Sequence, residues 1–211
     1  MSFLPGQEIR TQRAHLFDPE TYDDTAIDKA AYNLRLGNEV FISTEDKPTL
    51  LTSEDPFVVL KPGEFALLKT HEIVTLPKDI LGFITLRHTF KKHGLLNVSG
   101  FHVDPGFRGR LVFSVFNVGP NDVVLRYLEK VFMIFFATVV PATEIDVAHR
   151  HQNQQSFSLE DMMAIRGRSA SLVHIESRIR EIEGNVRFYG AIVAGVLLAL
   201  FALVVGLALK T

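Results

Sequence analysis

The sequence predicts an all-β domain that is followed by a helical stalk and one transmembrane helix. Three patterns lead to this prediction. Short apolar stretches alternate with Pro- and Gly-containing turns between residues 40 and 140, apolar residues recur at helical spacing from residue 172, and an uncharged run begins at residue 188. A chain of 211 residues has room for one domain and an appendage. We therefore expect a domain over residues 1–157, a stalk over 158–187 and a membrane span over 188–209.

The composition excludes several classes of protein. The formal net charge is −2, so the chain lacks the basic excess that binding to a nucleic-acid polymer requires. The sequence contains no Cys, which removes disulfides, thiolate metal ligands and Cys nucleophiles. Deaminases that use zinc depend on Cys ligands. Zinc-dependent deamination is therefore excluded, and no zinc is expected.

The predicted strands are bounded by turn residues. Residues 1–30 are expected to be mainly irregular or partly helical. Beyond residue 40, Lys61-Pro62-Gly63 follows the apolar stretch 57–60, and Asp104-Pro105-Gly106 precedes the stretch 110–116. Strands at this spacing, with Pro and Gly in the gaps and no helical period, predict a β-sandwich or a β-barrel.

A helical segment is predicted after the β domain. A short helix should open at Ser158, with Asp161 as its capping-box partner, and a hinge should follow at residues 167–171. The next apolar residues have spacings of 3, 4, 3 and 4, which is the pattern of a coiled-coil seam and favours a parallel oligomer. The alternative is one amphipathic helix that lies on its own domain or on the membrane. The seam residues are Leu172, Ile175, Ile179, Ile182 and Val186.

The predicted membrane span covers residues 188–209, which are 22 residues without a charge. At about 1.5 Å per residue this helix is about 33 Å long, enough to cross a hydrocarbon core of about 30 Å. The alternative is a buried helix of a large core. Arg178, Arg180 and Arg187 precede the run and Lys210 follows it, which favours a cytoplasmic N-terminal domain. We expect a single-pass, tail-anchored membrane protein with the lipid bilayer as a partner.

Several motifs, in order along the chain, resemble those of the dCTP deaminase and dUTPase superfamily. They are the stretches 31–38 (AYNLRLGN), 61–67 (KPGEFAL), 72–83 (EIVTLPKDILGF), 104–111 (DPGFRGRL), 116–120 (FNVGP) and 152–155 (QNQQ). The resemblance covers about residues 30–156. It implies a distorted jelly-roll, a dUTPase-like β-barrel, that assembles as a homotrimer with active sites at subunit interfaces. A parallel helical seam is consistent with such an oligomer.

The resemblance also implies a deoxynucleoside triphosphate, such as dCTP or dUTP, as the ligand, with Mg²⁺ on its phosphates. Members of the superfamily either deaminate cytosine or hydrolyse the α–β phosphate bond. The deaminases use a glutamate as general acid and base, and the matching position holds Ser114, whose hydroxyl cannot take that role near neutral pH. In dUTPases an aspartate in the preceding turn positions the attacking water, and this position holds Asp104. The alternative for Asp104 is a turn residue without a catalytic role.

The remaining site residues are also assigned through the resemblance. Arg87, Thr89 and Lys92 would bind the phosphates, although His88 stands where the family has a small hydroxyl residue. The alternative is a basic loop end in water. Phe107 would stack under the deoxyribose, and Asn117 would contact the nucleoside. Gln152 and Gln155 belong to the segment that closes over the nucleotide. His149 and His151 are interpreted as a solvated basic flank, so no metal site formed by the protein itself is expected.

These observations leave three hypotheses open. The first is a membrane-tethered nucleotide hydrolase in which pyrophosphate release is favoured over deamination. The second is a catalytically inactive nucleotide-binding sensor or effector at the membrane, and the third is a trimeric scaffold with a vestigial site. Ser114 and His88 depart from the deaminase pattern, as does Tyr127-Leu128 in place of the Pro-Gly turn typical of the family.

Overall fold

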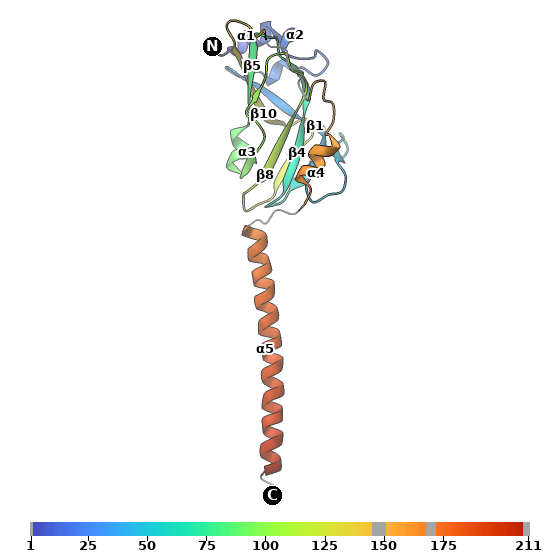
Figure 1. The fold of residues 1–211 in the computed structure, drawn as a ribbon, viewed down its shortest axis with the longest axis vertical. Helices are drawn as coiled ribbons and strands as arrows, with labels where there is room; N and C mark the ends of the chain where they lie inside the picture. The colour runs from blue at the N-terminus through green and yellow to red at the C-terminus, as the bar shows by residue number, and fades with distance from the viewer. Residues whose placement is uncertain (1, 145–150, 168–171, 209–211) are drawn as a thin grey trace. The chain divides into compact units, whose positions relative to one another are not determined.

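The computed structural model describes residues 2–144, 151–167 and 172–208. The chain divides into two compact units, Met1–Ser169 and Ala170–Thr211 (Figure 1). The first unit contains every described strand, and the second consists of one long helix.

The N-terminal residues form three short helical elements. They are α1 (Gly6–Thr11), α2 (Arg13–Leu16) and the 3₁₀ turn η1 (Asp24–Ala26). Ile9 and Leu16 are fully buried, so these elements contribute to the core although they are short. The main-chain N–H of Leu4 donates to the carbonyl of Phe136 at 2.8 Å, which fixes the start of the chain to the sheet. The prediction of a partly helical start is confirmed.

Antiparallel strands form a curled half-barrel. In the main sheet the order is β6-β8-β4-β1-β10-β5-β7, with β2 paired to β1, and β3 pairs with β9 in a separate ribbon. The strands alternate between buried and partly exposed residues, as the period of two predicts. Their bounds are β1 (Tyr32–Ile42), β2 (Thr49–Leu50), β3 (Phe57–Leu60), β4 (Phe65–Thr75), β5 (Ile80–Leu86), β6 (Leu95–Asn97), β7 (His102–Val103), β8 (Arg108–Asn117), β9 (Val123–Arg126) and β10 (Lys130–Thr138).

The core lies inside the curled sheet and is rich in aromatic residues. The rings of Phe113 and Phe132 stack with centroids 4.1 Å apart, and those of Phe17 and Tyr32 lie 4.3 Å apart. The core also holds one charged residue that is fully buried, Glu72, whose carboxylate accepts hydrogen bonds from Nε and the main-chain N–H of Arg35 at 2.7 and 2.8 Å. Its pairing satisfies a charge that burial alone would disfavour.

After β10, a C-terminal segment returns to the outer face of the sheet. The helix α4 (Leu159–Ile165) begins at Ser158, whose hydroxyl accepts from the main-chain N–H of Asp161 at 3.0 Å. The predicted helix start at Ser158 is therefore confirmed. Phe157 is buried against Phe41 and Leu67, so the helix belongs to the first compact unit.

The second unit is the helix α5 (Leu172–Ala208), which is continuous over 37 residues. Its stretch Ile179–Ala199 is, within the described part of the chain, the one helical stretch long and apolar enough to cross a bilayer, by length and composition. This stretch overlaps the predicted span, whose end at residue 209 lies outside the described residues, as do residues 168–171 of the predicted hinge. The seam residues Ile179, Ile182 and Val186 are exposed on this helix.

Candidate functional site

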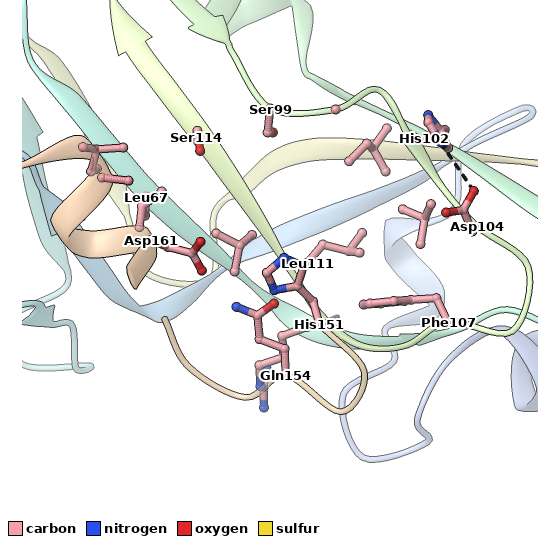
Figure 2. A pocket seen from close by; sticks show the side chains of 17 residues that line it. Leu67, Ser99, His102, Asp104, Phe107, Leu111, Ser114, His151, Gln154 and Asp161 are labelled. Carbon is pink, nitrogen blue, oxygen red and sulfur yellow. Dashed lines mark ion pairs between the residues drawn. The ribbon is translucent and has the colours of Figure 1, made fainter. Parts of the chain in front are cut away.

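A cavity of about 530 Å³ opens at the edge of β8, between the loop before β7 and the C-terminal segment. Its floor is apolar, with side chains such as Ile84, Val103 and Leu111. Figure 2 shows the polar side chains that surround this floor. They come from the stretch 99–114 and from the segment after residue 150, and are Ser99, His102, Asp104, Arg110, Ser114, His151, Gln154 and Asp161.

The cavity lies along the middle of the outer edge of β8, between the part that pairs with the β6 segment and the part that pairs with the C-terminal segment. At one end the N–H of Val98 donates to the carbonyl of Ser114 at 2.8 Å, and at the other the N–H of Arg110 donates to the carbonyl of Gln154 at 2.9 Å. Val112 lies between these two positions and lines the cavity. Because alternate residues of a strand turn their main-chain groups to the same edge, the N–H and C=O of Val112 face the cavity. The site therefore offers main-chain as well as side-chain hydrogen-bonding groups.

Asp104 and Phe107 lie together at one end of the cavity. The Asp104 side chain is 58% exposed, and its Oδ1 lies 3.4 Å from Nε2 of His102. The turn Asp104-Pro105-Gly106 reverses the chain through a positive φ of 86° at Gly106, which turns the buried ring of Phe107 toward the cavity. An exposed carboxylate beside an aromatic wall is suited to positioning water next to a ligand held by the ring. The turn role of Asp104 and a role in the site are thus compatible.

Ser114 and Asp161 lie at the other end (Figure 2). Ser114 points outward from β8, because the alternation of the strand turns Phe113 and Val115 into the core. Asp161 comes from the first turn of α4 and is partly buried. The sequence marked Asp161 as the capping-box partner of Ser158, and in the structure the Ser158 hydroxyl accepts from the N–H of Asp161 and donates to its Oδ2. The sequence gave no sign that this carboxylate also lines the cavity.

Arg110 supplies a cationic side chain to the cavity. Its Nη1 donates to the carbonyls of Thr70 and His71, and its Nε donates to Oε1 of Gln155 at 3.3 Å. Burial lowers the pKa of Arg110 from its ordinary value, while the carboxylate of Glu72 acts in the opposite direction. Sequence reasoning missed Arg110, although its position four residues before Ser114 on one strand places both side chains on one face.

The predicted phosphate-binding residues do not line this cavity. Arg87 precedes α3 (His88–Lys92), and its Nη1 donates to the carbonyl of Lys130 at 3.2 Å. Thr89 and Lys92 are exposed on this short helix, as is His88. Within one chain, the cationic helix therefore does not share the cavity that Phe107 lines.

Asn117 lies at the far end of β8 and is fully buried. Its Nδ2 donates to the carbonyls of Leu60 and Asn121 at 2.9 and 3.0 Å, and its Oδ1 accepts from the N–H of Gly119 at 3.0 Å. These bonds occupy the side-chain amide, which fastens the turn after β8 to the turn after β3. Asn117 does not line the cavity.

The two predicted glutamines fasten the C-terminal segment rather than line the cavity. Oε1 of Gln152 accepts from the N–H of Arg108 at 3.2 Å, and its Nε2 donates to the carbonyl of Gly106 at 3.4 Å. The main-chain carbonyl of Gln155 accepts from Nζ of Lys69 at 2.7 Å. Their neighbours His151 and Gln154 point into the cavity instead.

The described side chains provide no group of three His, Asp or Glu residues that could hold a metal ion. His149, which the sequence analysis considered together with His151, lies outside the described residues. Asp104 and Asp161 flank opposite ends of the cavity (Figure 2). Within the described residues, these two carboxylates therefore do not form a shared metal site.

Comparison with known proteins identifies the family. The family model described as dCTP deaminase-like matches residues 3–139. The chain therefore belongs to the dCTP deaminase-like family. It is 34% identical over 133 residues to the dCTP deaminase of Thermococcus sibiricus, a match that covers 63% of this chain and 80% of that protein. It is 30% identical over 149 residues to the dUMP-forming dCTP deaminase of Methanothermobacter thermautotrophicus, covering 63% of this chain and 75% of that protein.

A solved structure supports the fold. The crystal structure of the 2′-deoxycytidine 5′-triphosphate deaminase of Agrobacterium tumefaciens superposes with a TM-score of 0.53 at 18% identity. The match covers 64% of this chain and 47% of that chain. The predicted dCTP deaminase-like domain is thus confirmed, and both α4 and α5 lie beyond the segment that the family model matches.

Proposed function

We propose that the first unit binds a deoxynucleoside triphosphate in the cavity at the edge of β8 and hydrolyses it to the monophosphate and pyrophosphate. The observation that carries this proposal is that Asp104, Phe107 and Ser114 line one cavity. All three were chosen from the sequence for roles around one nucleotide. The family of the chain supports a nucleotide as the ligand, since its named relatives are dCTP deaminases.

In this proposal the reaction is attack of water on the α-phosphorus. The new P–O bond forms as the α–β phosphate bond breaks, pyrophosphate leaves, and the proton of the water passes to a base. Asp104 orients this water through its exposed carboxylate, and Phe107 holds the deoxyribose by stacking. His102, whose Nε2 lies 3.4 Å from Oδ1 of Asp104, is placed to direct this carboxylate.

Deamination is the less favoured reaction. It requires a carboxyl group that takes a proton from water and returns it to the leaving ammonia, and the matching position on β8 holds Ser114. The serine hydroxyl can donate or accept a hydrogen bond to the base, but it cannot carry the proton.

The proposed site is completed by other copies of the chain in a homotrimer. Arg87, Thr89 and Lys92 do not line the cavity of their own chain, so the cations of Arg87 and Lys92 and the hydroxyl of Thr89 would serve the triphosphate of a neighbouring copy. Mg²⁺ bound to the phosphates would neutralise part of their charge. This sharing makes activity depend on assembly.

We further propose that α5 anchors the protein in a membrane as a single-pass tail, with the first unit on the cytoplasmic side. The apolar stretch Ile179–Ala199 supports this proposal. When the full chain is mixed with lipid vesicles and centrifuged in a density gradient, it should float with the vesicle fraction. Replacing Val193 and Val196 by Lys, which places charges within the uncharged run that begins at residue 188, should abolish flotation.

The test of catalysis uses the full chain in detergent with dCTP or dUTP and Mg²⁺, and follows pyrophosphate and ammonia. Pyrophosphate release that falls at least a hundredfold in Asp104→Asn would support hydrolysis. Asp79→Asn is the matched control, because Asp79 is an exposed turn carboxylate outside the cavity. Pyrophosphate release at wild-type rate in Asp104→Asn would overturn the role of Asp104.

The second candidate is a catalytically inactive nucleotide sensor. It is favoured by Ser114, which removes the deaminase acid, and by α5, which gives the nucleotide domain a membrane-type appendage. It predicts no turnover but thermal stabilisation by nucleotide, of about 2.7 kcal/mol at a concentration one hundred times Kd. A trimeric scaffold with a vestigial site would show neither turnover nor stabilisation.

A further inference from the structure

The helix α4 adds a wall to the cavity from outside the family-matched segment. Phe157, just before the helix, is buried in a cluster with Phe41 and Leu67, and Met162 and Ile165 of the helix pack against the same cluster. The main-chain N–H of Gly167 donates to the carbonyl of Ser43 at 2.8 Å, which fixes the end of α4 to the turn after β1. The position of α4 is therefore set at both ends.

This docking directs one carboxylate into the cavity. Asp161 lines the cavity on the same side as His151 and Gln154, and its side chain points toward the interior (Figure 2). One carboxylate oxygen, Oδ2, accepts a hydrogen bond from the hydroxyl of Ser158. A carboxylate has about four acceptor positions, so Asp161 can serve as a helix cap and still accept from a ligand.

The surroundings of Asp161 favour a ligand that donates hydrogen bonds. The apolar side chains of Leu67, Val112 and Ile165 line the same cavity. A carboxylate in such surroundings is stabilised by N–H donors and destabilised by a carbonyl placed opposite it. Cytosine presents an amino group at its C4 position, where uracil presents a carbonyl oxygen. Ser114 can adapt to either base, because its hydroxyl both donates and accepts.

We propose that Asp161 reads the base by accepting a hydrogen bond from the exocyclic amine of a cytosine-type nucleotide, so that a helix beyond the family-matched segment determines specificity. This inference rests on the proposed function, because it assumes that a nucleotide occupies the cavity. It assigns to Asp161 the preference for cytosine over uracil and leaves the position of the attacking water to Asp104.

The test measures the affinities of the full chain in detergent for the α,β-imido analogues of dCTP and dUTP with Mg²⁺, by calorimetry. These analogues cannot be cleaved at the α–β bond, so binding is separated from turnover. Wild type should prefer the cytosine analogue about tenfold or more. Asp161→Asn removes the negative charge and turns one acceptor into an N–H donor. It should weaken binding of the cytosine analogue by about tenfold to a hundredfold, the range for losing a charge-assisted hydrogen bond, and leave binding of the uracil analogue unchanged or tighter.

Two control variants separate base reading from helix stability. Glu160→Gln removes a carboxylate one residue away that does not line the cavity, and it should keep the preference. Ser158→Ala removes the cap but leaves the carboxylate of Asp161, so it should lower the thermal stability while keeping the preference.

The outcomes distinguish this inference from the proposed function. If Asp161→Asn retains the wild-type preference, or if Ser158→Ala loses it to the same degree, Asp161 has a structural role and the inference is overturned. If wild type binds both analogues equally, the inference fails while nucleotide binding stands. If wild type binds neither analogue, the proposed function fails and the inference fails with it.

Discussion

The ammonium group of Lys69 lies 2.8 Å from the carboxylate of Glu39, and both side chains are almost entirely buried beneath the C-terminal segment. Lys69 also donates to the carbonyl of Gln155, and the hydroxyl of Ser156 lies 2.7 Å from both carboxylate oxygens of Glu39. This ion pair joins β1 and β4 and at the same time fastens the segment that carries one wall of the cavity.

Replacing Lys69 by Met should therefore destabilise the protein and release the segment. The change leaves the Glu39 carboxylate buried without its cation, which costs about 3–5 kcal/mol. Thermal unfolding gives the loss of stability, and hydrogen exchange at residues 153–157 reports the release. Lys61→Met, at an exposed turn, is the control.

The double variant Lys69→Met/Glu39→Leu separates the two effects. With both charges replaced by apolar groups, most of the stability should return, but exchange at residues 153–157 should stay fast because the bonds to Gln155 and Ser156 remain absent. Slow exchange in the double variant would show that the segment is held by its other contacts.

His71 should make stability depend on pH. Burial, with smaller contributions from the nearby cations Arg35 and Arg110, lowers the pKa of His71 from 6.5 to about 4. The unfolded chain then binds a proton that the folded chain does not, so the stabilising contribution is complete above pH 6.5 and is lost as the pH falls toward 4. Because His71 is only half-buried, solvent screening reduces the effect to about 1 kcal/mol between pH 7 and pH 5.

Urea unfolding of wild type and His71→Gln at both pH values measures this effect. The free energy of unfolding should fall more steeply with acidification in wild type than in the variant. If the free energy of unfolding falls equally in wild type and His71→Gln, the His71 imidazole has the same pKa in the folded and unfolded states.

Asn117→Ala should lower stability by about 2–3 kcal/mol. The change removes three hydrogen bonds of a fully buried amide and leaves the carbonyl of Leu60 and the N–H of Gly119 without this partner. Chemical denaturation gives the magnitude, with Asn97→Ala at the partly exposed end of β6 as the control. A variant of wild-type stability that no longer binds nucleotide would restore the contact role that the sequence suggested for Asn117.

Leu128→Gly should be more stable than Leu128→Ala by about 0.5–1 kcal/mol. Leu128 adopts φ 61°, a left-handed conformation that costs a residue with a side chain about 1–2 kcal/mol, whereas glycine adopts it freely but loses more entropy on folding. Leu128 is 39% exposed, so both Leu128→Gly and Leu128→Ala lose part of its packing, and the comparison between the two variants isolates the backbone strain. Leu128→Ala, which keeps the strain, should not stabilise, and a lower melting temperature for Leu128→Gly than for Leu128→Ala would contradict this explanation.

Local sequence patterns predicted the strands, and the resemblance to the superfamily assigned three of the residues that line the cavity. The turn Asp104-Pro105-Gly106 and the alternation of β8 are set by neighbouring residues, and the positions that the resemblance assigned to Asp104, Phe107 and Ser114 do line one cavity. Asn117 belongs to the same run of sequence, but whether its amide faces a ligand or a turn depends in part on Leu60, which is distant along the chain.

The other end of the site depends on tertiary packing. The sequence placed α4 at the start of the stalk, because Ser158 and Asp161 form a cap within one helical turn. Docking of Phe157 on Leu67 brings the helix to the sheet instead, and this contact joins residues about ninety positions apart. No pattern local to residues 158–165 contains that information, so Asp161 appeared only as a cap.

The covering of β8 has a further consequence for the behaviour of the chain. Two elements cover its outer edge. β6 covers the end of the strand near Asn117, and residues 153–154 cover the end near Arg108. A bare strand edge pairs readily with other extended chains and is a common origin of aggregation. A chain cut before residue 151 would present such an edge beside the apolar surface of Phe41 and Leu67. The segment that shapes the cavity therefore also protects the sheet from self-association.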